Sequence, residues 1–241
     1  MSTVLDIFAS IIQGSALGPA SYVANAADLT TVTPGNAMFK YADDTYIIIP
    51  ARNTQSRGNE LDNVSKWSLA NNLRLNKAKC VEIVFTDSRR KLQICHPPTI
   101  PDIQRVTSVS ILGVTISNRL SVSEHVQSII SKCAQSIHAL KILGSHGMSS
   151  DALKVICKFV VLTKLLYASP AWWCFATLAD KQRLEAFLRR GVGLNLYSAL
   201  DPSVSQRVQD TDDELFSAVM ANSHHVLHHM LPDRTSHPYT L

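Results

Sequence analysis

Short apolar runs separated by turn residues fill the first half of the chain, and helical spacing takes over near residue 120. Met38–Tyr41 and Thr45–Ile49 are β-prone runs on either side of Ala42-Asp43-Asp44. This pattern predicts a β-hairpin with acidic residues at its turn. Cys80–Phe85 predicts another strand, and Val109–Ile116 a strand pair or a strand bent at a glycine. The spacing therefore predicts an α+β chain whose strands precede most of its helices.

Apolar residues at helical spacing dominate the second half. Ser121-Val122-Ser123-Glu124 fits a capping box and predicts the start of a helix that ends at Gly144 and Gly147. The apolar face expected on this helix consists of Val126, Ile129, Ile130, Cys133, Ile137 and Leu140. Another helix is expected from Ser150 to Pro170, with a buried second half. In the first half, a segment rich in alanine and small residues predicts a helix over Ala20–Leu29, and apolar spacing predicts another over Leu61–Leu73. Two more helices are expected over Ala179–Arg190, which is basic, and over Asp213–Met230, which opens with an acidic turn.

Composition excludes several classes of protein. The chain has 241 residues, of which 46% are hydrophobic and 17% are charged, which argues against a disordered or collagen-like chain. No apolar run reaches the roughly 18 residues that span a bilayer, and the first residues make a poor signal peptide, so no membrane partner is expected. The five cysteines contain no CxxC pair, which argues against a disulfide framework or a structural zinc site. We expect a reducing intracellular compartment, cytoplasm or nucleus.

Positive charge is concentrated in one stretch. Ten of the Lys and Arg residues lie between Arg52 and Arg105, against five acids, within a chain of net charge +4. Such a surplus suits a phosphate backbone as partner, and a solvated basic face is the alternative.

The sharpest chemical feature is Tyr41-Ala42-Asp43-Asp44, flanked by apolar runs. Adjacent carboxylates repel each other, and sharing divalent cations offsets that cost. Mg²⁺ takes oxygen ligands and keeps positions free for substrate phosphates. Two such ions about 3.5–4 Å apart can clamp a phosphoryl transfer. A solvated acidic turn is the alternative.

The histidines His224, His225, His228 and His229 form i,i+4 pairs within the expected C-terminal helix. Two such pairs could bind Zn²⁺. The other interpretation is an exposed helix that docks through its apolar residues, and it is favoured because no carboxylate or cysteine stands at ligand spacing.

Four blocks in register resemble the reverse transcriptases of non-LTR retrotransposons. They are Gln13-Gly14-Ser15-Ala16-Leu17-Gly18-Pro19, Tyr41-Ala42-Asp43-Asp44, Leu75-Asn76-Lys77-Ala78-Lys79 and Ile111-Leu112-Gly113-Val114. The resemblance covers about four fifths of the chain, from Ile11 to Ser198. It implies a right-hand polymerase in which an antiparallel palm sheet with helices precedes a helical thumb. We expect a partial palm over 1–120, a thumb-like region over 121–200 and a helical tail over 201–241.

The resemblance also implies roles for individual residues. Asp43 would bind metal directly and Asp44 would assist, with two Mg²⁺ or Mn²⁺ ions in an intact family member. The implied partners are an RNA template, a DNA primer and deoxynucleotide triphosphates. Contacts with template or nucleotide fall on Gln13, Gly14, Tyr41 and Lys79, and the primer grip on Leu112, Gly113 and Val114.

The family pattern breaks upstream of Gln13. The resemblance implies a third carboxylate on an earlier strand, but only Asp6 precedes Gln13, without the family's flanking residues. The fingers and any endonuclease are also missing. We therefore expect a fragment that is weak or inactive by itself, completed by a missing N-terminal region or a complementing chain. The alternatives are a catalytically dead relic that binds nucleic acid and a remnant without function.

Overall fold

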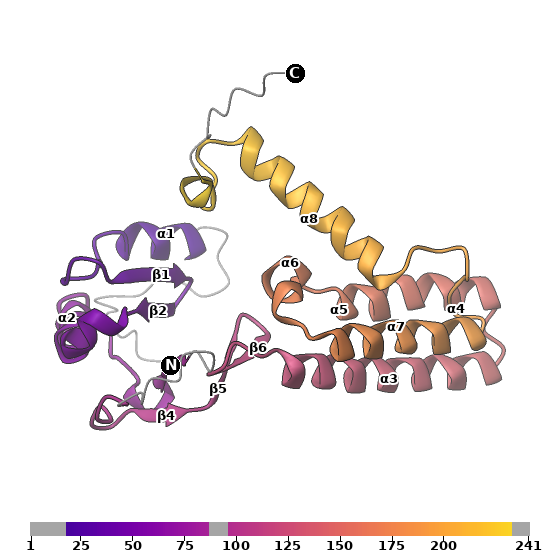
Figure 1. Ribbon diagram of the computed structural model, residues 1–241, viewed down its shortest axis with the longest axis horizontal. Helices are drawn as coiled ribbons and strands as arrows, with labels where there is room; N and C mark the ends of the chain where they lie inside the picture. The colour runs from indigo at the N-terminus through magenta and orange to yellow at the C-terminus, as the bar shows by residue number, and fades with distance from the viewer. Residues whose placement is uncertain (1–17, 87–95, 233–241) are drawn as a thin grey trace, which may run out of the picture. The chain divides into compact units, whose positions relative to one another are not determined.

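A computed structural model describes residues 18–86 and 96–232, which fall into two compact units. Unit 1 contains residues 18–84 and 96–106, and unit 2 contains residues 85–86 and 107–232. Both units mix helices with small sheets, which agrees with the predicted α+β class (Figure 1). Within the described ranges, no helix combines the length and apolar character needed to cross a membrane.

Unit 1 holds two small sheets and one long helix. Strands β1 and β2 pair antiparallel, from Ala37 opposite Ile48 to Tyr41 opposite Asp44, which confirms the predicted hairpin. Strands β3 and β4 pair in parallel. The elements are α1 (Gly18–Asn25), β1 (Ala37–Tyr41), β2 (Asp44–Ile48), the 3₁₀ turn η1 (Ala51–Ser56), α2 (Arg57–Ala70), η2 (Lys77–Lys79), β3 (Val81–Ile83) and β4 (Gln104–Val106).

Helix α2 organises unit 1. It begins four residues before the predicted Leu61 and stops at Ala70, where Asn71 donates its backbone N–H to the last carbonyls. The side chain of Arg57 in α2 forms an ion pair with the carboxylate of Glu82 in β3. Arg105 of β4 pairs with the other oxygen of the same carboxylate. This Arg–Glu–Arg arrangement joins α2 to the parallel strand pair.

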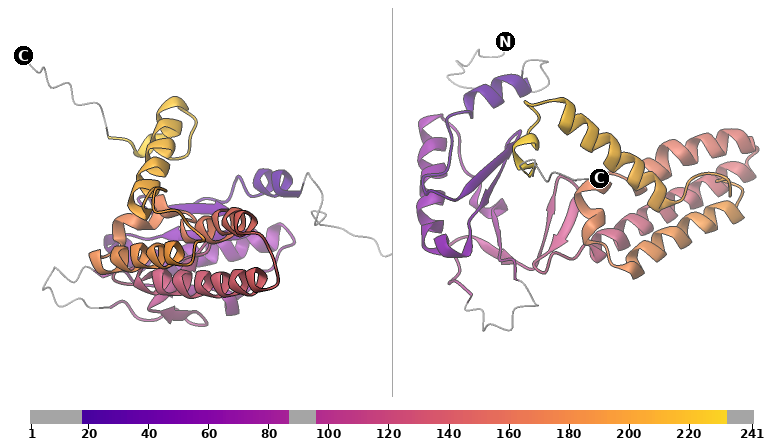
Figure 2. Two further views of the ribbon diagram at one scale, coloured as in Figure 1. Left: turned by 90° about the vertical axis from the view of Figure 1, so that its right-hand side faces the viewer. Right: turned by 45° about the horizontal axis from the view of Figure 1, so that its top comes forward.

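Unit 2 is a helical bundle that follows one hairpin. Figures 1 and 2 show α3, α4, α5 and α7 side by side, with α8 leaving the bundle at an angle. The elements are β5 (Ser108–Ile111), β6 (Val114–Ser117), α3 (Ser123–Ser145), α4 (Ser150–Ile156), the π-helix η3 (Cys157–Leu162), α5 (Thr163–Leu165), α6 (Ser169–Trp172), η4 (Trp173–Phe175), α7 (Leu178–Gly193), α8 (Val204–Ala221) and η5 (His228–Met230).

The bundle core forms around the predicted apolar face of α3. Its side chains pack with buried residues of the other helices, among them Trp172, which is fully buried, Leu165 and Leu184. Burying each such side chain stabilises the fold by about 1.5–3 kcal/mol. The α3 residues that the core buries are Val126, Ile129, Cys133, Ile137 and Leu140.

The predicted helix from Ser150 to Pro170 is wrong in two respects. The chain is α-helical only to Ile156, passes through the π-helix and α5, and breaks at Ala168, whose φ is +52°. Pro170 therefore lies in the first turn of α6, where its missing N–H costs nothing, instead of ending the longer helix. The second half is also only partly buried, since Phe159 is 75% exposed.

The predicted capping box before α3 is also wrong. Val122 occupies the N-cap, and its side chain cannot accept a hydrogen bond. Ser121 is engaged in the turn after β6, where its carbonyl accepts from the N–H of Ser117. At the far end, Gly144 lies inside the helix, and only Gly147, with φ +95°, follows its end as predicted.

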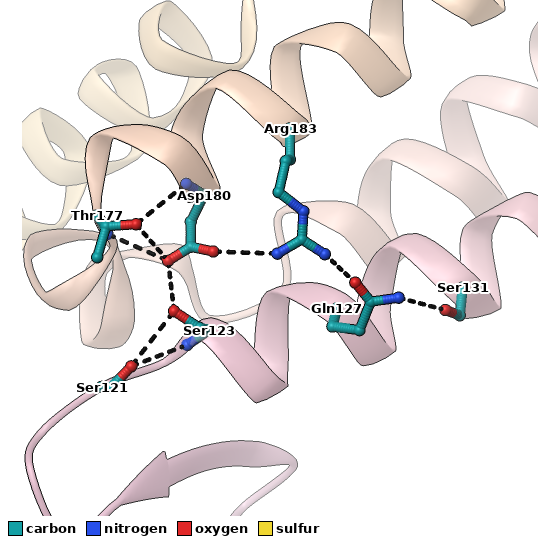
Figure 3. A network of polar contacts seen from close by, with 7 residues as sticks. All are labelled: Ser121, Ser123, Gln127, Ser131, Thr177, Asp180 and Arg183. Carbon is teal, nitrogen blue, oxygen red and sulfur yellow. Dashed lines mark hydrogen bonds and ion pairs between the residues drawn. The ribbon is translucent and has the colours of Figure 1, made fainter.

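The capping box in unit 2 is at α7 instead. The Thr177 hydroxyl accepts from the N–H of Asp180, and the Asp180 carboxylate accepts from the N–H of Thr177 (Figure 3). The same carboxylate accepts from the hydroxyl of Ser123, the first residue of α3, at 2.7 Å. One buried carboxylate thus joins the N-terminal ends of two neighbouring helices.

The last predicted helix is displaced along the chain. Helix α8 begins at Val204, capped by Ser203, and ends at Ala221, so the acidic residues near 212 lie inside it and not in its first turn. The burial of Val204 and Val208 in the core accounts for the earlier start. The histidines 224–229 follow the helix in turns, so the predicted i,i+4 pairs do not form.

Candidate functional site

The two adjacent aspartates lie at the tip of the β1–β2 hairpin. Tyr41 pairs with Asp44, so Ala42 and Asp43 form a two-residue turn between the strands. Ala42 has a φ of +49°, a left-handed conformation that costs a non-glycine residue about 1–2 kcal/mol. Both aspartates are exposed to solvent. The local fold therefore presents two carboxylates at one tight, strained turn.

One face of the hairpin carries Asp44 together with aromatic side chains. Pairing places Tyr41, Asp44, Phe39 and Tyr46 on the same face of the ladder. The Tyr46 hydroxyl donates to Asp44 Oδ2 at 3.4 Å. Burial raises the pKa of Tyr46, and the neighbouring Asp44 carboxylate raises it further. The phenol therefore stays protonated and can donate to that carboxylate at neutral pH.

Lys40 fastens the opposite face of the hairpin to α1. Its ammonium group donates to the backbone carbonyls of Ala26 and Leu29, just beyond the end of that helix. A cation here is favourable because the carbonyls at a helix C-terminus carry partial negative charge. Lys40 therefore helps to hold the hairpin in place.

Glu60 of α2 holds the loop that leads into β1. Its fully buried carboxylate accepts from the backbone N–H groups of Val32 and Thr33, at 3.1 and 2.9 Å, and from the Asn36 amide at 2.7 Å. Burial acts to raise the pKa of Glu60, but these hydrogen bonds together outweigh it, so the pKa lies below its ordinary value. The carboxylate stays charged and fixes the entry to the hairpin.

Two more contacts secure the same segment. The Trp67 indole donates to Asp28 at 2.8 Å, and the Asn63 amide donates to the carbonyl of Thr30 at 2.8 Å. Both donors come from α2, so the helix holds the segment before β1 at three points along its length. The segment that leads into the hairpin with the two aspartates is therefore held in place by α2.

The donor set at the turn fits a hard divalent cation. Mg²⁺ commonly binds through one or two carboxylates, with water and substrate phosphates completing its shell. Asp43 and Asp44 supply such oxygens and are open to solvent. Within residues 18–86 and 96–232, no three His, Cys, Asp or Glu side chains gather to hold a metal. The turn therefore offers two protein donors.

The structure brings together only some of the predicted site residues. Tyr41, Asp43 and Asp44 share the hairpin. Lys79 lies exposed at the end of η2, and among the described residues no hydrogen bond or ion pair joins it to either aspartate. Gln13 and Gly14 lie outside the described residues.

The remaining predicted residues lie in unit 2, where Leu112 and Gly113 form the turn between β5 and β6 and Val114 is the first residue of β6. Sequence analysis did not identify Tyr167, whose hydroxyl donates to the carbonyl of Leu112 at 3.2 Å. No local signal reveals this contact, because 55 residues separate its partners. Asp180 was also missed, although the Thr177–Asp180 spacing is a recognisable capping-box pattern.

Comparison with known proteins identifies the relatives of this chain. It is 28% identical over 141 residues to an RNA-directed DNA polymerase from the mobile element jockey of Drosophila melanogaster, a match covering 53% of this chain. Part of the chain is therefore similar to RNA-directed DNA polymerases of non-LTR retrotransposons. A polymerase of the same description from Drosophila funebris is 27% identical over 69% of the chain. A probable RNA-directed DNA polymerase from transposon BS is 25% identical over 76% of it.

The chain spans only a small part of the length of the curated relatives it matches. The matches cover 15%, 20% and 22% of their respective lengths. No protein-family model matches the chain. No solved structure matches it either. The predicted resemblance to non-LTR reverse transcriptases is therefore confirmed by sequence alone.

Proposed function

We propose that this chain is part of an RNA-directed DNA polymerase of a retroelement, with its catalytic carboxylates at Asp43 and Asp44. The observation that carries the proposal is the exposure of both aspartates at one rigidly supported turn, in a chain similar to such polymerases. Under this proposal, residues 1–120 belong to a palm, 121–200 to a thumb-like region and 201–241 to a helical tail.

The proposed reaction is nucleotidyl transfer on a primed RNA template. The 3′-hydroxyl of a DNA primer loses its proton to water and attacks the α-phosphorus of a deoxynucleotide triphosphate. A new P–O bond forms, the bond from the α-phosphorus to the oxygen that bridges it to the β-phosphorus breaks, and pyrophosphate leaves with the electrons of that bond. Bound Mg²⁺ or Mn²⁺ would stabilise the charge that develops on the attacking and leaving oxygens. In this scheme Asp43 and Asp44 hold and orient the ions.

The other site residues take positions around this reaction. Tyr41 stands beside Asp44 in the ladder, where an aromatic ring can contact the primer or nucleotide. Lys79 offers a cation to the triphosphate. We propose template and nucleotide contacts for Gln13 and Gly14. The proposed primer grip consists of Leu112 and Gly113 in the turn and Val114 at the start of β6.

Primer extension tests the proposal. The chain is incubated with an RNA template, a DNA primer and deoxynucleotides, in Mg²⁺ and separately in Mn²⁺. Asp43→Asn should reduce extension by more than about 100-fold, because even residues that only support metal ligands contribute about 10–100-fold. The matched control is Asp62→Asn, which removes an exposed carboxylate from α2. Equal extension by the parent and Asp43→Asn would contradict the proposed role of this turn.

A second candidate function is nucleic-acid binding without catalysis. It is favoured by one observation, that the described residues bring only two carboxylates to the turn and no third metal ligand. The logarithm of the binding affinity would then fall linearly with the logarithm of the salt concentration, and the parent and Asp43→Asn would bind with equal affinity. Filter binding of a primed template at several salt concentrations measures this. Absence of extension together with salt-dependent binding would favour this second function.

A further inference from the structure

The turn between β5 and β6 is built from residues in an unusual backbone conformation. Leu112 and Gly113 have φ values of +47° and +85°, and they separate the paired residues Ile111 and Val114. Positive φ at both central residues matches the tight hairpin turn that Asn-Gly normally occupies. A leucine in the first position costs about 1–2 kcal/mol, so this turn needs support from its surroundings.

Tyr167 supplies support on one side. Its hydroxyl donates to the carbonyl of Leu112 at 3.2 Å. Its ring also lies against Gly113, because a Cβ placed on that glycine would come within 3.3 Å of the ring. Glycine is thus favoured at this position by its φ, and a Cβ there would also press against the tyrosine ring, which would have to shift by a few tenths of an ångström.

The backbone of Tyr167 is anchored in the core of unit 2. Its carbonyl accepts from the indole N–H of Trp172 at 2.9 Å, and Trp172 is fully buried. The next residue, Ala168, has a φ of +52° at the break between α5 and α6. This break turns Tyr167 out of the bundle, so that its side chain is 53% exposed and can reach the hairpin.

A second contact holds the other side of the hairpin. The N–H of Thr115 donates to Nδ1 of His125 at 3.3 Å, and the imidazole packs edge-on against Trp172 with 5.2 Å between ring centroids. His125 is 3% exposed. The two supports of the turn, through Tyr167 and through His125, therefore converge on the same buried indole.

We propose that Tyr167 is a positioning residue that holds the Leu112–Gly113 turn in a preformed geometry for contact with a primer–template duplex. The proposal rests on the proposed function, in which this turn touches nucleic acid. Leu112 and Gly113 are both exposed at the tip and are available for such a contact. A preformed turn binds more tightly because its ordering is not paid for during binding. Tyr167 acts indirectly, because its hydroxyl donates to the carbonyl of Leu112 and thereby holds the turn.

The experiment compares Tyr167→Phe with Tyr197→Phe in the full chain. Tyr197→Phe is the control, because its hydroxyl also donates to a backbone carbonyl of unit 2, that of Pro202 at 2.7 Å, far from the turn in sequence. The same hydroxyl accepts from Arg207 at 2.9 Å, so the control removes at least as many hydrogen bonds as Tyr167→Phe. The first readout is amide hydrogen exchange of residues 111–115. The second is affinity for an RNA template with a DNA primer, from fluorescence anisotropy at several salt concentrations.

We expect exchange of residues 111–115 to become about 3–10-fold faster in Tyr167→Phe, the change that loss of one hydrogen bond produces. We expect the dissociation constant to rise by a similar factor, about 3–10-fold, with an unchanged slope of log affinity against log salt, because no charge is removed. Tyr197→Phe should lower the melting temperature and leave both readouts at the parent values.

Three results would overturn parts of the reasoning separately. Parent-like exchange in Tyr167→Phe would overturn the proposed positioning. Faster exchange with unchanged affinity would overturn the link between positioning and binding. A parent chain that binds no primer–template at all would overturn the proposed function, and the exchange readout would then decide the positioning role alone.

Discussion

The carboxylate of Asp180 offers the most direct test of what holds the helical unit together. It is 3% exposed and accepts hydrogen bonds from the hydroxyls of Ser123 and Thr177, each at 2.7 Å, and from Arg183 at 3.2 Å. Replacing Asp180 with alanine removes all of these bonds at once. The hydroxyl of Ser123, at the start of α3, would lose its partner on the neighbouring helix.

The expected loss of stability in Asp180→Ala is the sum of the interactions that the substitution removes. The bond from the Thr177 N–H to Asp180, which is the reciprocal half of the capping box, is lost at a cost of about 1 kcal/mol. Loss of the hydrogen bond from Ser123 to a charged oxygen costs about 1.5–3 kcal/mol. The pair with Arg183 contributes little, since that side chain is 41% exposed. We therefore expect Asp180→Ala to lower the free energy of unfolding by about 3 kcal/mol, which corresponds to about 6–12 °C in Tm for a chain of this size.

Urea unfolding at pH 7, followed by circular dichroism, measures this change. The matched control is Asp151→Ala, which removes an acid from the first turn of α4, where it is 95% exposed and, among the described residues, forms an ion pair with Lys154 alone. The control should cost less than about 1 kcal/mol. If Asp180→Ala and Asp151→Ala differ by less than 1 kcal/mol, the buried carboxylate does not join the two helices in the way described.

Three further predictions concern stability. Burial, and secondarily the charge of Lys132, lowers the pKa of His125, so below about pH 6.5 the unfolded chain binds a proton that the folded chain does not. The free energy of unfolding should therefore fall as the pH drops below about 6.5, and urea titrations should show a smaller fall in His125→Gln. Glu60→Gln should cost about 1.5–3 kcal/mol by thermal denaturation. Gly113→Ala should destabilise by about 1 kcal/mol, whereas Gly58→Ala, an open helical position, should stabilise slightly in the same assay.

Features set by neighbouring residues were predicted well from the sequence. The β1–β2 hairpin was expected over Met38–Tyr41 and Thr45–Ile49, and each strand lies within one residue of those limits. Alternating burial and turn chemistry act over a few residues, so a local pattern carries the information. The apolar face of α3 was predicted for the same reason.

Helix ends show where local patterns fail. Ser121–Glu124 and Thr177–Asp180 have the same capping spacing, yet only the second is a cap. The first is prevented because Ser121 closes a turn with Ser117, a contact made outside the helix. Local spacing could not distinguish the two, because the competing hydrogen bonds come from the preceding strand.

Long-range contacts could not be predicted at all. The bond from Tyr167 to Leu112 spans 55 residues, and that from Ser123 to Asp180 spans 57. Each depends on how the helices pack, and nothing near either residue indicates its partner. The position of α8 was missed for the same reason, since the burial of Val204 and Val208 outweighed the acidic pattern further along.

The loop before the hairpin has the chemistry of a small carboxylate receptor. The N–H groups of Val32 and Thr33 and the amide of Asn36 all point at one guest, which is the side chain of Glu60. Host and guest belong to one chain, so the effective concentration of the carboxylate is far above that of any free anion. Replacing Glu60 with alanine would leave these donors without their acceptor, and a small acid such as formate would then bind in the place that the Glu60 carboxylate now fills.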